Sequence, residues 1–113
     1  MKDDRVVFVP LNAAITTTPE PGMQRQTLAY NQKVMLVRHC LSEGWNGASH
    51  SHPHEQLVYV VTGCILFTAG GKSVEMRSGD SIVVAGDVEH HATALEDSEV
   101  LDVFVPWRRD YAL

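Results

Sequence analysis

Five of the six histidines in this chain fall into two short clusters, a density that indicates metal chemistry. The clusters are His50, His52 and His54, then His90 and His91, while His39 stands alone. Neutral imidazole is the commonest metal ligand in proteins. His50 and His52 are two residues apart, so their side chains point to the same face of an extended backbone. The pattern therefore predicts a transition-metal site that a third histidine, His90 or His91, completes.

Gln56 lies four residues after His52 and shares its face if the chain stays extended. His54 has the same parity, but Pro53 disturbs the local backbone. A lone pair of alternating histidines is usually a surface or core feature, whereas the second cluster and the glutamine favour a metal.

A second group of candidate residues lies near the C-terminus. Asp102 and Phe104 alternate on one face of a predicted strand, opposite a face of apolar residues. A buried carboxylate is costly unless it is paired or used, so Asp102 either works inside the protein or faces solvent on an edge strand. Alternation alone leaves both readings open. Arg108 follows two residues after Pro106, and it either grips a substrate carboxylate or forms a surface salt bridge with Asp110.

The elements that must position these residues are predicted to be short strands. Alternating and β-branched runs predict strands at 6–9, 24–30, 33–41, 55–62, 64–69, 72–77, 81–85, 90–95 and 99–105. Gly70-Gly71 predicts a hairpin between two of them. The segment 12–23, rich in Thr, Pro and Gly, is predicted to be a loop, and no stretch has a helical period of useful length. About nine closely spaced strands favour an all-β sandwich or small barrel.

Composition limits the classes of function. The chain has 113 residues, of which 44% are hydrophobic and 20% charged, as in one globular domain. A formal charge of −5 argues against binding to nucleic acid. No apolar stretch approaches the roughly 20 residues that span a bilayer, and the first residues lack the apolar core of a signal peptide. With only Cys40 and Cys64, we expect a cytoplasmic protein without contact to membrane.

The spacing of these residues resembles the two cupin motifs. Gly44, His50-x-His52, Gln56 and Gly63 match the first motif, with Gln56 where that motif has glutamate. The run from Gly79-Asp80 to His90 is similar to the second motif, which has a proline where Ala85 stands. The resemblance implies a double-stranded β-helix (jelly-roll-like) barrel: one domain over 1–113, with an N-terminal strand and loop at 1–23, a barrel core at 24–106 and a tail at 107–113. It also implies one divalent ion of nickel, zinc, iron or manganese, held by His50, His52, Gln56 and His90, with His39, His54 and His91 as bystanders.

A narrower resemblance covers LAYNQKVMLV, HSHPHEQ and the ending LDVFVPWRRDY, which look like small cupins of the KdgF type. That family is associated with pectin and alginate breakdown, and the resemblance implies conversion of 4,5-unsaturated monouronates to their linear ketonised form. Its functional residues fall on Asp102 and Arg108 as catalytic groups, and on Phe104 and Arg108 as substrate-binding groups. Trp107 and Arg109 depart from the family pattern. The alternatives are a metal-dependent dioxygenase or cyclase-like cupin, and a cupin that binds metal or a small ligand without catalysis. By analogy of fold we expect a homodimer.

Overall fold

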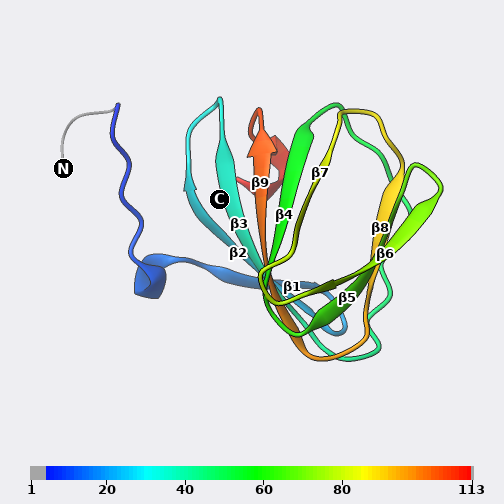
Figure 1. Cartoon of the computed structure of the whole chain (residues 1–113). Coiled ribbons are helices and arrows are strands. Elements are labelled where there is room, and N and C mark those ends of the chain that lie inside the picture. Colours follow the sequence, from blue (N-terminus) through cyan, green and yellow to red (C-terminus); the bar gives the residue numbers. More distant parts are fainter. Residues whose placement is uncertain (1–4, 113) are drawn as a thin grey trace.

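Two antiparallel sheets face each other in the computed structural model, which describes residues 5–112 (Figure 1). The strands of the described chain are β1 (Thr16–Glu20), β2 (Met23–Tyr30), β3 (Met35–Leu41), β4 (Glu55–Thr62), β5 (Cys64–Ala69), β6 (Lys72–Arg77), β7 (Ser81–Val84), β8 (His90–Ala94) and β9 (Ser98–Val105). The larger sheet has the order β1-β2-β3-β9-β4-β7 and the smaller sheet the order β6-β5-β8. The chain crosses between the sheets after β4, β6, β7 and β8, which confirms the predicted jelly-roll barrel.

Two short 3-10 helices lie outside the sheets, namely η1 (Leu11–Ala13) and η2 (Arg109–Tyr111). Within residues 5–112, no helix is long and apolar enough to cross a membrane.

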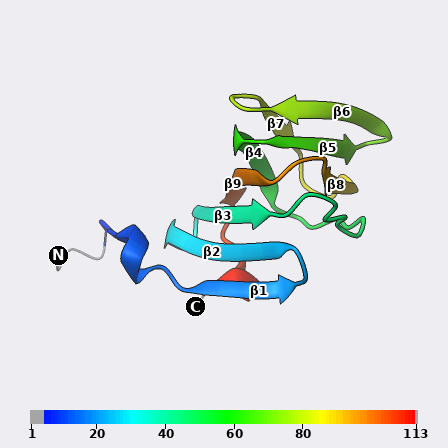
Figure 2. The same ribbon diagram turned by 90° about the horizontal axis from the view of Figure 1, so that it is seen from below.

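Two predictions for the N-terminal region are wrong. Residues 6–9, predicted as a strand, have no strand partner within the described chain and form an extended arm that projects from the barrel (Figure 2). A strand needs a hydrogen-bonded neighbour, which local sequence cannot guarantee. The segment 12–23, predicted as a loop, contains β1, because its β-branched threonines suit a strand and Pro19 is tolerated on the edge strand of a sheet. Residues 1–4 and 113 of the predicted terminal segments lie outside the described residues.

Alternation along β9 sends every second side chain into the barrel. Asp102 and Phe104 are only 5% and 2% exposed. Both side chains therefore face the interior, which decides between the two readings that alternation left open. Asp102 is in register with Val37 of β3 and with Val58 of β4, so strands flank its carboxylate on both sides.

The apolar core lies between the two sheets. Its buried members from both sheets are Leu41, Val58, Val60, Ile65, Phe67, Met76, Val84, Ala94 and Val100. A smaller cluster of Met35, Val37 and Phe104 packs against Tyr30, Trp107, Tyr111 and Ala112. The second cluster holds the C-terminal tail against the larger sheet, and this contact positions Arg108 beside the barrel interior.

Gly63 separates β4 from β5, where the chain leaves the larger sheet for the smaller one. Its φ is +91°, and a Cβ atom at this position would collide with the carbonyl oxygen of Asp97 and with Ser98 Oγ. Gly71, in the turn between β5 and β6, has a similar φ of +79°, but nothing lies within 4 Å of a Cβ atom built there. The two glycines therefore share the conformational requirement and differ in the space around them.

We expect Gly71→Ala to lower the free energy of unfolding by about 1–2 kcal/mol, the cost of a left-handed backbone for a residue with a Cβ atom. Gly63→Ala should lower it by roughly 3–5 kcal/mol, because the overpacking adds to that cost. Urea unfolding followed by tryptophan fluorescence measures both changes. Equal losses in the two variants would contradict the steric role assigned to Gly63.

Candidate functional site

Three histidines from two segments of the chain come together at the barrel. His50, which precedes β4, forms an isolated antiparallel bridge with His90 of β8, with N–O distances of 3.0 and 2.9 Å. The ring of His52 lies 5.6 Å from that of His50 and 4.9 Å from that of His90. One nitrogen from each ring lies within 4.8 Å of the others. The group contains the two alternating histidines, and its third member is His90.

Hydrogen bonds determine which nitrogen of each ring carries the proton. In His50, His52 and His90, Nδ1 lies 3.1, 3.2 and 2.8 Å from a backbone carbonyl oxygen and so donates to it. A neutral imidazole has one proton, so each Nε2 keeps a free lone pair. Burial lowers the pKa of His52 and of His90, which keeps both rings neutral at pH 7. An Nδ1 held by a carbonyl, with a free Nε2, is typical of histidines that bind metals.

The free lone pairs require a partner that the protein itself does not supply. His90 Nε2 is buried and has no hydrogen-bond partner. His52 Nε2 lies 2.9 Å from Gln56 Oε1, so two acceptor atoms face each other with no proton between them. Buried acceptors in this arrangement are costly unless a cation lies near both. Imidazole nitrogen and amide oxygen suit several divalent transition metals, and these residues fit one such ion.

A chain of hydrogen bonds runs from Gln56 across the sheet. Gln56 Nε2 donates to Asp102 Oδ1 at 2.9 Å, and His39 Nδ1 lies 2.7 Å from Asp102 Oδ2. Arg25 Nε donates to His39 Nε2 at 3.0 Å, so His39 must carry its proton on Nδ1 and donate to the carboxylate. Both oxygens of the buried Asp102 carboxylate therefore accept a hydrogen bond.

A cavity of about 320 Å³ lies beside these groups. The residues predicted for the site that border it are His50, Gln56, His90, Asp102, Phe104 and Arg108. His52 is not among the described residues that border the cavity. Its ring contacts His50, His90 and Gln56, which do border it. The volume suits a small molecule of one ring.

Two arginines, Arg25 and Arg108, border this cavity. The Arg108 guanidinium binds Asp110 through Nε and Nη2, at 3.1 and 2.8 Å, and this ion pair holds the pKa of Asp110 below its usual value. Nη1 of Arg108 is buried without a partner. The guanidinium carbons of Arg25 and Arg108 lie 3.7 and 4.1 Å from the ring centroid of Tyr111. Arg108 thus forms the surface pair with Asp110 and still offers one donor for a ligand.

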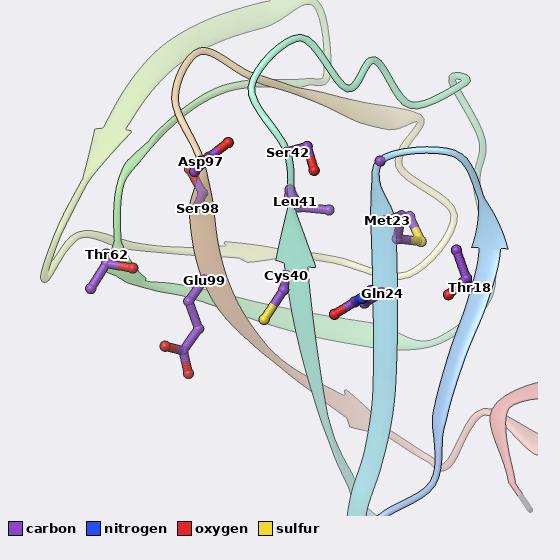
Figure 3. Close-up of a pocket in the computed structure, with 11 residues that line it drawn as sticks. Thr18, Met23, Gln24, Cys40, Leu41, Ser42, Thr62, Asp97, Ser98 and Glu99 are labelled. Carbon is purple, nitrogen blue, oxygen red and sulfur yellow. The ribbon is translucent and has the colours of Figure 1, made fainter.

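A second hollow, of about 450 Å³, is bordered by residues of β1, β2, β3 and β9 (Figure 3). Its carboxylates are already paired: Glu99 accepts from Arg38 Nε at 2.7 Å, and Asp97 accepts from the Glu43 backbone N–H at 2.8 Å. Neither a histidine nor an arginine is among the described residues that border it. Although it is larger, it lacks the converging polar groups of the barrel cavity, so we take the barrel cavity as the candidate site.

The remaining histidines have different surroundings. His54 Nε2 donates to the Trp107 carbonyl oxygen at 3.1 Å, and His91 borders the cavity but lies outside the three-histidine group. His39, predicted to be a bystander of the metal site, lies outside the three-histidine group, but it binds Asp102 and borders the cavity. Its parity with the buried residues of β3 was the signal that could have found it, because a residue in phase with Val37 must also point inward.

We expect the purified protein to bind one divalent transition metal, and His90→Ala to weaken that binding at least about 100-fold, because it removes a nitrogen ligand. His91→Ala is the matched control, since it removes the same side chain from the next position of β8, and it should leave affinity within about 3-fold. Competition with a chromophoric chelator measures both affinities. Equal loss in the two variants, or none in His90→Ala, would contradict the proposed centre.

Comparisons with known proteins agree with this geometry. The cupin domain family matches residues 37–105. KdgF from Halomonas sp. is 33% identical, covers 94% of this chain and 100% of its own, and superposes with a TM-score of 0.88. An RmlC-like cupin from Shewanella frigidimarina is 30% identical, covers 93% and 95%, and gives a TM-score of 0.89.

More distant structures share the fold alone. Salicylate 1,2-dioxygenase from Pseudoaminobacter salicylatoxidans is 17% identical over 79% of this chain and 26% of its own, with a TM-score of 0.75. Among curated protein sequences, none matches this chain significantly. The family model spans more than half of the chain, and the KdgF likeness extends over nearly all of it. The chain therefore belongs to the cupin family, and among its members it resembles KdgF.

Proposed function

We propose that the protein is a metal-dependent enzyme that opens and ketonises 4,5-unsaturated monouronates. The proposal depends on one observation: Asp102, Phe104 and Arg108 border the same cavity as the histidine group. These are the residues to which the resemblance to KdgF-type cupins assigns function. The likeness to KdgF from Halomonas sp. supports that transfer over nearly the whole chain.

The side chains around the cavity suit a uronate. A divalent metal held by His50, His52, Gln56 and His90 would act as a Lewis acid that polarises a substrate oxygen. Arg108 binds the substrate carboxylate through Nη1, the guanidinium nitrogen that has no partner in the protein. Phe104 offers an apolar ring against which a sugar face can pack, and Asp102 is the proton carrier.

The reaction is an isomerisation that needs protons moved but no oxidant. Ring opening takes the proton from the anomeric hydroxyl while the bond between the anomeric carbon and the ring oxygen breaks. The enolate that results becomes a ketone when a proton is added at the alkene carbon. The Asp102 carboxylate accepts the first proton and returns it, after releasing one of its hydrogen bonds.

We expect the metal-loaded protein to remove the alkene absorbance of 4,5-unsaturated galacturonate faster than buffer does. Arg108→Ala should lower kcat/KM about 10- to 100-fold, since a hydrogen bond to a charged group contributes about 1.5–3 kcal/mol. Arg109→Ala is the matched control, because Arg109 is the exposed neighbour and should leave kcat/KM unchanged.

Other outcomes would favour the other cupin functions. If the metal-loaded protein binds the uronate without consuming it, a binding role replaces the enzymatic one. Oxygen uptake with phenols or thiols, without uronate turnover, would favour a dioxygenase. An unchanged kcat/KM in Arg108→Ala would remove this residue from substrate binding even if turnover is confirmed.

We also propose that two copies form a homodimer. The arm at residues 6–9 projects from the barrel (Figure 2). It exposes apolar side chains, and Phe8 is 74% exposed. The outer face of β4 and β7 is apolar as well, because Leu57 and Val83 are paired neighbours and both exposed. One chain thus carries both an unpaired apolar segment and an apolar sheet face, and a second copy would cover both.

For this homodimer, we expect Val83→Ser to raise the dimer dissociation constant by about 10-fold, because a buried valine side chain contributes about 1.5 kcal/mol or more. Val74→Ser is the control: Val74 is 44% exposed, against 62% for Val83, and lies on β6, in the other sheet. Sedimentation velocity over a concentration series measures both constants. A monomeric wild-type protein at all concentrations would refute the dimer.

The state of the two cysteines supports a proposal about the compartment. Cys40 and Cys64 are both free, with Cys64 buried in the barrel and Cys40 half-buried. Because free thiols persist in reducing surroundings, we propose that the protein works in the cytoplasm.

A further inference from the structure

The Asp102 carboxylate determines which end of the Gln56 amide faces the histidine group. An amide has a donor end and an acceptor end, and a carboxylate accepts hydrogen bonds only. With Asp102 Oδ1 2.9 Å away, Gln56 must present Nε2 to Asp102, and Oε1 then points to His52. The opposite orientation would set the amide oxygen against a carboxylate oxygen and the amide N–H groups toward the metal centre.

The orientation of Asp102 is itself fixed from the other side. His39 donates from Nδ1 to Oδ2, and Arg25 fixes that tautomer through its bond to His39 Nε2. The two donors reach Asp102 from the strands on either side of β9. Asp102 is only 5% exposed, so little water reaches its carboxylate to compete with the two donors.

We propose that Gln56 and Asp102 work as one ligand unit, in which Asp102 is a positioning residue that turns the amide oxygen toward the metal. In this unit the ligand itself is neutral. The negative charge lies on Asp102, which is separated from the metal position by the Gln56 amide. The inference rests on the metal centre of the proposed function but not on the reaction with uronates.

If Gln56 and Asp102 work as one unit, the effect of Asp102→Asn on metal affinity depends on which residue occupies position 56. With glutamine there, the new amide of Asp102→Asn accepts from His39 through its oxygen and turns its N–H groups toward Gln56, so Gln56 turns its own oxygen away from the histidines. With glutamate there, both ends of the side chain are oxygens and need no orientation. The new asparagine in Q56E/D102N can then accept from His39 and donate to the new carboxylate, whereas Q56E alone puts two carboxylates within hydrogen-bond distance of each other.

The test measures the affinity of four metal-free proteins for Co²⁺ alone, by chelator competition and by the visible absorption of the bound ion. The proteins are the wild type, D102N, Q56E and Q56E/D102N. We expect D102N to bind Co²⁺ about 10- to 100-fold more weakly than the wild type, the usual cost of losing an outer partner of a metal ligand. In the glutamate background, D102N should leave affinity unchanged or increase it.

A control variant separates the orientation of the Gln56 amide from the electrostatic attraction between a carboxylate on β9 and the metal ion. Glu99→Gln removes an equal charge from the outward face of the same strand, where Glu99 pairs with Arg38, and should leave Co²⁺ affinity within about 3-fold. If D102N weakens binding by the same factor in both backgrounds, Asp102 acts only through its charge and the proposal is wrong. It is equally wrong if D102N leaves the wild-type affinity unchanged.

Circular dichroism establishes that each variant is folded before titration. If D102N alone does not fold, the comparison of Q56E with Q56E/D102N still decides, because the double variant keeps a partner for every polar group. A drop in affinity from Q56E to the double variant would then overturn the proposal. Absence of uronate turnover in all four proteins would refute the proposed reaction and leave these affinities interpretable.

Discussion

A carboxylate buried in the middle of a β-sheet dictates the polar arrangement around it. Asp102 lies on β9, between β3 and β4, and is in register with Val37 and Val58. Its hydrogen-bond donors come from the diagonal positions on these strands, two residues from each register partner: His39 on β3 and Gln56 on β4. The strand pairing thus brings both donors within reach, and the acceptor-only carboxylate determines how each must be oriented.

In the histidine group, too, the hydrogen-bond donors already have acceptors, and acceptor atoms are left over. Backbone carbonyls take the Nδ1 protons of His50, His52 and His90, so the Nε2 lone pairs are left over. Gln56 adds an oxygen to these nitrogens, because its donor end is used by Asp102. A centre with only acceptors remains, and acceptors at close range are stabilised by a cation. The suitability of this barrel for a metal ion is therefore a consequence of where the protons are.

Much of the fold and of the candidate site could be predicted from the sequence, and the features that could not be predicted have physical causes. Alternation predicts that His50 and His52 share a face, because the period of a strand is two residues. Alternation cannot say which face is inward, so the burial of Asp102 required the pairing of β9 with both neighbours. Residues 6–9 have the composition of a strand but no partner in the described chain, whereas Thr16–Glu20 has a partner and tolerates Pro19 at the sheet edge. His39 was missed because its significance lies in a contact 63 residues away along the chain.

The electrostatics of the cavity differ from those of the whole chain. The formal net charge is −5, whereas the cavity is bordered by two guanidinium groups, of Arg25 and Arg108, and by two carboxylates, of Asp102 and Glu20. Asp110 neutralises part of Arg108 from outside, and its pKa is lowered by that pairing, so it stays ionised. A divalent ion among neutral imidazoles and an amide would add two charges that no ligand cancels directly. Of the carboxylates that border the cavity, Asp102 is engaged by two donors and Glu20 accepts from Trp45 Nε1, so an incoming anion would meet a locally positive cavity in an acidic protein.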